Sequence, residues 1–185
     1  ALTLLNGTFL EELVATFNQA LAQLEQDLSQ EGSQQLAFNA LSVPQVAALL
    51  AAGNAVIALM SLMLGRYWQA ALYNPGGFGD EFRALSLPRD AVLIMAAAAT
   101  ALWWMGPEWR VWSAVAVLPL TVVGFALAHA YAAQTGKGVT WLTLIYVVWI
   151  VLDPAKWLWV ACVVIDAFVN FRAKWSAKTG TGSKD

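Results

Sequence analysis

The chain has 185 residues, of which 59% are hydrophobic and only 12% are charged, and its formal net charge is −2. A soluble domain of this size carries roughly 25% charged residues, so the polar surface is too small to cover a water-facing globule. The near-neutral charge gives no indication of nucleic-acid binding. A single cysteine and a single histidine exclude an internal disulfide and a metal site built from several Cys or His ligands. The composition therefore predicts an all-α polytopic membrane protein, with the lipid bilayer as a partner and no cofactor.

Residues 1–41 are predicted to contain the end of a preceding span and an external amphipathic helix. The chain opens with Ala1-Leu2-Thr3-Leu4-Leu5, and no basic region precedes this apolar stretch, so it does not read as a signal peptide. We interpret it as the end of a spanning helix, and a mature N-terminus left after processing is the alternative. Thr8 followed by Glu11 fits a capping box at the start of the next helix.

Residues 9–31 have the pattern of an acidic amphipathic helix. The apolar residues alternate at spacings of four and three, which is a heptad seam, and they are Leu10, Val14, Phe17, Leu21, Leu24 and Leu28. The acidic residues are Glu11, Glu12, Glu25, Asp27 and Glu31. Helices that lie on a lipid surface usually carry Lys and Arg instead. We therefore expect the seam to pack on protein, either within this chain or on a partner, with Glu12, Gln19 and Gln26 exposed.

Residues 42–171 are predicted to form a membrane domain of five spans. Ser42 and Gln45 make a second capping box, which opens a charge-free apolar run from Val43 to Gly65. The other four runs are residues 91–105, 111–133, 139–152 and 157–171. As a single helix, residues 139–171 would be about 50 Å long, well beyond a hydrocarbon core of about 30 Å. Two short spans separated by Asp153-Pro154-Ala155-Lys156 are therefore expected.

The distribution of Lys and Arg predicts the orientation. In the five-span arrangement one side holds Arg66, Arg83, Arg89, Lys137, Arg172, Lys174, Lys178 and Lys184, and the other holds only Arg110 and Lys156. The positive-inside rule then places the connection 66–90 and the tail 172–185 in the cytoplasm, and the acidic helix outside. The expected location is the bacterial inner membrane, in a multi-pass arrangement with a cytoplasmic C-terminus. An odd number of earlier spans is expected before residue 1.

The connection 66–90 contains the most distinctive motif. Its candidate functional residues are Tyr73, Asn74, Pro75, Gly76, Gly77, Phe78, Gly79 and Asp80. Pro75 and Gly76 suit a type II turn, because Gly adopts a positive φ readily, and Asp80 can cap a short helix. The motif is Gly-rich but lacks the Lys-Ser/Thr ending of a phosphate-binding loop. The alternative is an interfacial loop that Trp68, Tyr73, Phe78 and Phe82 anchor at the lipid headgroups.

This motif, with Leu64-Gly65-Arg66-Tyr67-Trp68-Gln69 before it and Glu81-Phe82-Arg83 after it, resembles the proteobacterial branch of the YybS-like family of multi-spanning bacterial membrane proteins. The resemblance covers the chain from about Leu41 to Phe171, and it implies further spans before residue 1. A more distant similarity to the substrate-binding components of energy-coupling-factor transporters implies a transporter-like role. Neither resemblance carries a substrate-binding residue over to this chain.

Four polar residues in the predicted spans are candidates for a ligand site or a polar core: Asp166, Asn170, His129 and Asn54. A carboxylate such as Asp166 is costly at bilayer depth, so it normally faces a cavity or a partner. Asp166 is expected either to bind a cation, a proton or a basic ligand group, or to pair with Arg172. His129 and Asn54 are expected to make hydrogen bonds between helices, and a ligand role is the alternative for His129.

Two functions stay open at this stage. A transporter-like solute-binding component would need a cavity between helices, lined by polar groups and several aromatic residues. A non-transporting structural or assembly partner of another membrane complex would need a filled bundle and an exposed face of small residues, for which pairs such as Ala97 and Ala101 are candidates. The partner could then be another membrane protein or a second copy. An enzyme is not expected, because no nucleophile–base pair is visible.

Overall fold

The computed structural model describes residues 7–30, 38–136 and 138–175, and within these ranges the chain is helical apart from short connections. The helices are α1 (Gly7–Gln30), α2 (Val43–Tyr73), α3 (Gly77–Ala84), α4 (Arg89–Trp104), α5 (Pro107–Thr135), α6 (Gly138–Val151) and α7 (Asp153–Val169). No strand occurs in the described ranges, and the all-α class is confirmed. The apolar opening of residues 1–5 and the basic tail beyond residue 175 lie outside the described residues.

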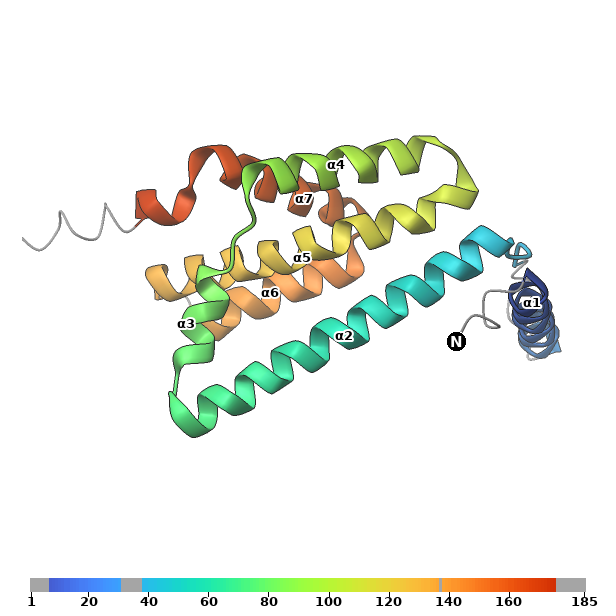
Figure 1. Cartoon of the computed structure of the whole chain (residues 1–185), viewed down its shortest axis with the longest axis horizontal. Coiled ribbons are helices and arrows are strands. Elements are labelled where there is room, and N and C mark those ends of the chain that lie inside the picture. The colour runs from blue at the N-terminus through green and yellow to red at the C-terminus, as the bar shows by residue number, and fades with distance from the viewer. Residues whose placement is uncertain (1–6, 31–37, 137, 176–185) are drawn as a thin grey trace, which may run out of the picture.

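The helix α5 is the centre of the bundle, because it packs against α2, α3, α4, α6 and α7. The chain runs back and forth between two ends (Figure 1). One end gathers α3, the end of α5 and the start of α6, and the other gathers the start of α2, the α4–α5 turn and the α6–α7 turn. This alternation has the order expected from the five apolar runs.

Two helices, α2 and α5, are long and apolar enough to cross a membrane. The pair α3 and α4, bent by 68°, and the pair α6 and α7, bent by 119°, raise the number of candidate spans to four if each pair counts as one. The predicted number of five is therefore not confirmed. The helices α4, α6 and α7 are about 24, 21 and 26 Å long at 1.5 Å per residue, which is short of a core of about 30 Å. The apolar helices are compatible with a membrane-embedded protein.

Two predicted boundaries were wrong. The helix α2 continues past Arg66 to Tyr73, because this stretch contains good helix formers and no Gly or Pro before Pro75. Likewise, only Leu152 separates α6 from α7. The predicted linker belongs to the first turn of α7, where Pro154 is tolerated because the N–H that it lacks would have no helical partner.

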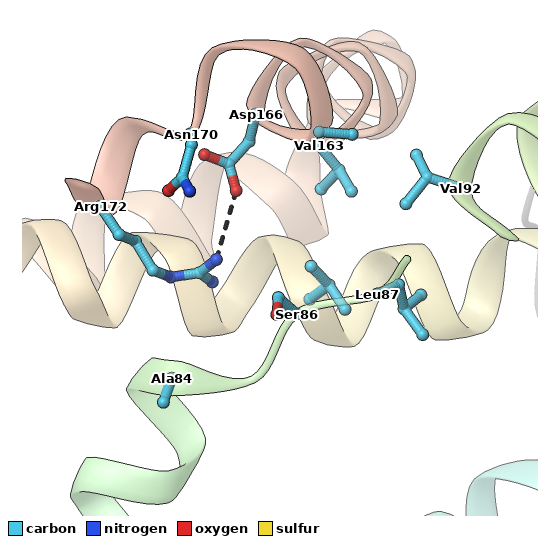
Figure 2. Close-up of a pocket in the computed structure, with 10 residues that line it drawn as sticks. Ala84, Ser86, Leu87, Val92, Val163, Asp166, Asn170 and Arg172 are labelled. Atoms are coloured by element: carbon cyan, nitrogen blue, oxygen red, sulfur yellow. Dashed lines mark hydrogen bonds and ion pairs between the residues drawn. The ribbon is translucent and has the colours of Figure 1, made fainter. Parts of the chain in front are cut away.

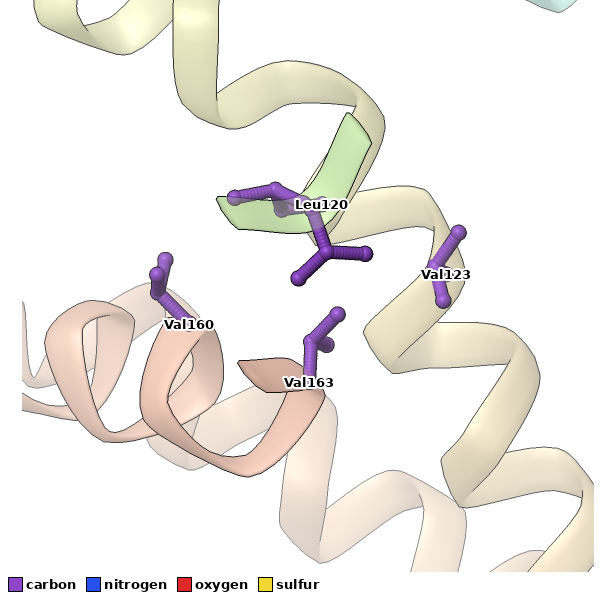
Figure 3. Packing of buried hydrophobic residues seen from close by; sticks show 5 residues of the cluster. Leu120, Val123, Val160 and Val163 are labelled. Atoms are coloured by element: carbon purple, nitrogen blue, oxygen red, sulfur yellow. The ribbon is translucent and has the colours of Figure 1, made fainter. Parts of the chain in front are cut away.

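The best-buried apolar side chains fill the space between α4, α5 and α7. This cluster consists of Val92, Leu120, Val123, Val160 and Val163. Leu120 and Val123 on α5 face Val160 and Val163 on α7 (Figure 3). Lipid tails are as apolar as these side chains, so in a bilayer the cluster stabilises the bundle mainly through close van der Waals packing.

The closest approach between α5 and its neighbours occurs at Gly124. A Cβ atom at this position would lie 2.2 Å from Nε1 and 2.6 Å from Cδ1 of Trp159 on α7. The indole N–H of Trp159 donates to the backbone carbonyl of Thr121, at 3.3 Å. The absence of a side chain at Gly124 therefore creates the space in which the Trp159 ring lies flat against α5.

The helix α1 is seen nearly end-on in Figure 1 and lies across the end of the bundle where α2 begins. It starts at Gly7, so Thr8 lies inside its first turn and does not precede the helix as the predicted cap. Glu12, Gln19 and Gln26 are exposed as predicted. The seam is not buried within this chain, because Phe17 and Leu24 are exposed and its other four residues are only half-buried.

Candidate functional site

The polar site at one end of the bundle is formed where α7 stops. Asn170 ends the helix in the left-handed region, with φ 49° and ψ 69°, a conformation that Asn tolerates better than most residues. Its backbone N–H donates to the carbonyl of Asp166, at 2.8 Å. This turn folds the following residues 171–175 back beside the last turn of α7, so that residues before and after the break face each other.

Asp166 and Arg172 form an ion pair across this turn. Oδ2 of Asp166 accepts from a guanidinium N–H of Arg172 at 3.2 Å, and Oδ1 accepts from the backbone N–H of Phe171 at 2.8 Å. The side chains of Asp166 and Arg172 are 10% and 19% exposed, respectively. A second N–H of Arg172 donates to the carbonyl of Leu85, at 2.9 Å. The pair therefore ties the end of α7 to the connection between α3 and α4, and the cationic partner expected for Asp166 is confirmed.

A cavity of about 210 Å³ lies beside this ion pair (Figure 2). Its polar lining residues are Ser86, Asp166, Asn170 and Arg172, and its apolar ones are Ala84, Leu87, Val92, Val123, Val163 and Ala167. These residues include no aromatic side chain. The charge of Asp166 is already balanced, so a cation or a basic ligand group would have to compete with Arg172 for the carboxylate.

The structure brings together only two of the four candidate polar residues, Asp166 and Asn170. The Nδ1–H of His129 donates to the carbonyl of Phe125 in its own helix, at 2.8 Å, because a carbonyl oxygen can only accept. Asn54 is exposed on α2 and donates to the carbonyl of Leu50, at 2.8 Å. The expected hydrogen bonds between helices were therefore wrong for these two side chains. Each lies four residues beyond a carbonyl that its short polar group can reach within the helix.

The Gly-rich motif folds into the predicted type II turn. Gly76 has φ 89° and ψ −19°, and the backbone N–H of Gly77 donates to the carbonyl of Asn74 at 2.9 Å. A Cβ atom at Gly77 would lie 2.1 Å from the side-chain nitrogen of Asn74. The helix α3 starts directly at Gly77, so Asp80 sits in its first turn and pairs with Arg83 at 2.5 Å, and does not cap the helix.

An ion pair between Arg66 and Glu81 fastens this motif to α2, with both carboxylate oxygens accepting from the guanidinium. A cavity of about 110 Å³ lies next to it, lined by Arg66, Gln69, Ala70, Tyr73, Asn74 and Glu81. Of the four aromatic residues considered as headgroup anchors, Trp68 and Tyr73 are exposed, whereas Phe78 and Phe82 are half-buried.

Phe78 and Phe82 belong to a chain of aromatic contacts that the sequence did not reveal. Successive rings lie 4.7–6.2 Å apart, in the order Tyr67, Phe78, Phe82, His129, Tyr146, Phe125 and Trp159. Edge-on and offset contacts of this kind stabilise by about 0.5–1.5 kcal/mol each beyond the area they bury. The rings come from five helices, so no spacing within one segment could have indicated the chain of contacts.

Fold and site together define a helical, apolar bundle with an ion-paired polar cavity at one end. Comparison with family models, with curated proteins and with solved structures finds no match for this chain. The function must therefore be argued from the arrangement of the described residues.

Proposed function

We propose that this chain is a multi-spanning component of the bacterial inner membrane that acts as a non-transporting assembly partner of another membrane protein. The observation that supports this role best is the filled interior of the bundle. Val92, Leu120 and Val163 are less than 2% exposed at its centre, and the cavity of about 210 Å³ lies at one end. A solute-binding component would need an aromatic-lined cavity between the helices.

The exposed face of α4 is suited to close contact with another helix. Ala97 and Ala101 are exposed and lie four residues apart on one side of α4. Ile94 and Trp104 on the same side are 69% and 83% exposed. Small residues at this spacing let two helix backbones approach closely inside a membrane, and the larger neighbours then pack around the contact.

The assembly role predicts that enlarging these alanines reduces the size of the native complex. For the full chain, extracted from its own membranes in mild detergent, Ala97→Leu with Ala101→Leu should shift the sizing-column peak to a smaller species. Ile57→Leu, a change at an exposed position on α2, is the matched control and should leave the peak in place. An unchanged peak for the double variant would contradict assembly through α4.

A transporter-like solute-binding role is the second candidate, and the cavity beside Asp166 and Arg172 favours it. Its polar lining offers a carboxylate and a guanidinium to a small ligand. Such a ligand would have to replace one partner of an ion pair that is already formed, which weighs against high affinity. This cost places the solute-binding role second.

The proposed topology has five passes, with the C-terminus in the cytoplasm and α1 outside. In a Cys162→Ser background, cysteines introduced at Glu25 and Glu108 should react with an impermeant maleimide from outside, because these residues lie at the end of the bundle poor in Lys and Arg. Cysteines at Asp80 and Lys174 should react only from the cytoplasmic side. Labelling of Glu25→Cys and Lys174→Cys from the same side would rule out five passes.

A further inference from the structure

The outward side of α1 carries an apolar strip, defined here as Phe9, Phe17 and Leu24. These side chains are 41%, 38% and 47% exposed. The helix holds on to the rest of the chain through another side, where Asn18 exchanges two hydrogen bonds with the backbone of Leu41, at 3.1 and 2.8 Å. The contact is thus a polar anchor near the middle of α1, and it leaves the outward strip open.

The charge on α1 indicates what kind of surface the strip can meet. Between Gly7 and Gln30 the helix has four acidic residues and no basic one, and no Lys or Arg occurs anywhere before Arg66. Phe17 and Leu24 occupy the d positions of the heptad seam, so Glu11 and Glu25 take e positions and Asp27 takes a g position. Charges at e and g set the choice of partner in helix pairs, because they meet the charges that flank the partner's seam.

We propose that this strip binds an amphipathic helix of another protein, with an apolar heptad seam flanked by Lys or Arg. The apolar residues supply the contact, and the acidic positions beside them select a basic partner over an acidic one. This inference rests on the proposed assembly role and deepens it by naming the surface outside the bundle and the chemistry of the partner.

A second copy of the chain fits the strip less well. The helix α1 lies across the end of the bundle (Figure 1), so two copies related by a two-fold axis along the membrane normal would pair their α1 helices antiparallel. Antiparallel pairing sets e positions against e positions, which brings Glu11 opposite Glu25 of the other copy. An anionic lipid surface would meet the same acidic residues and be repelled.

The experiment uses the full chain in phosphatidylcholine nanodiscs and two fluorescent peptides of about four heptads, with identical Leu seams and either Lys or Glu at every e and g position. The Lys peptide should bind about tenfold more tightly than the Glu peptide, since several flanking ion pairs of a few tenths of a kcal/mol each add up. Leu24→Asp should abolish binding of the Lys peptide. Gln19→Asp, on the exposed polar side of α1, should change it little.

A charge-reversed chain with Glu11→Lys, Glu25→Lys and Asp27→Lys should prefer the Glu peptide. Equal affinities for the two peptides, or no binding of either, would overturn the proposal. So would dimerisation of the chain, or binding to phosphatidylglycerol vesicles, if Leu24→Asp abolished it. The readout involves α1 alone, so a failure here together with a size shift from the α4 variants would refute this inference and leave the assembly role intact.

Discussion

Replacing Arg172 with Met is expected to lower the free energy of unfolding by about 3–5 kcal/mol, because it leaves the Asp166 carboxylate buried without its cation. The change also removes the hydrogen bond from Arg172 to the carbonyl of Leu85, so the connection between α3 and α4 loses its tie to α7. Thermal unfolding of the purified full chain in detergent measures the effect. Combining Arg172→Met with Asp166→Asn should recover part of the loss, because no unpaired charge is then left in the site.

The matched control for this change is Arg83→Met. Arg83 pairs with Asp80 at 2.5 Å, but both side chains are well exposed, at 40% and 79%. An exposed pair contributes about 0–1 kcal/mol, so the control should unfold close to the wild type. Equal losses in the two variants would show that the burial of Asp166 and Arg172 does not govern their contribution.

The single change Asp166→Asn separates a structural pair from a ligand site. Asn preserves the size of the side chain and its ability to accept from the N–H of Phe171, but it removes the charge that Arg172 faces. A structural pair should lose stability, whereas a ligand-binding carboxylate should lose binding or transport while the chain folds normally. Unfolding and function have to be measured on the same preparation, since a destabilised chain also loses activity.

The sequence predicted the local features of this site better than the long-range ones. The type II turn at Pro75 and Gly76 follows from the backbone preferences of two adjacent residues, and Arg172 is only six residues from Asp166. The bond from Arg172 to Leu85 joins positions 87 residues apart, which no local pattern encodes. The five-span prediction failed for a related reason. Apolar runs fix where helices form, whereas their lengths and the bends between them depend on packing against α5.

The packing of Trp159 against α5 is such a non-local feature, and it gives the last prediction. Gly124→Ala should destabilise the bundle by about 1–3 kcal/mol, the usual cost of overpacking, because the new Cβ would lie 2.2 Å from the indole nitrogen. The displaced ring would also lose its hydrogen bond to the carbonyl of Thr121. Thermal unfolding of the purified chain, monitored by Trp fluorescence, tests both the loss of stability and the movement of the ring.

Gly53→Ala on α2 is the matched control, because nothing lies within 4 Å of a Cβ atom placed there. It should stabilise the chain by about 0.5–1 kcal/mol, since Ala restricts the unfolded chain more than Gly and favours the helix. The same chemical change is thus expected to have opposite signs on the two helices. Adding Trp159→Phe to Gly124→Ala should cost less than the sum of the separate effects, because the smaller ring relieves the collision. If Gly124→Ala stabilised the chain as Gly53→Ala does, or if the two changes at Gly124 and Trp159 were additive, the close approach between α5 and α7 would be wrong.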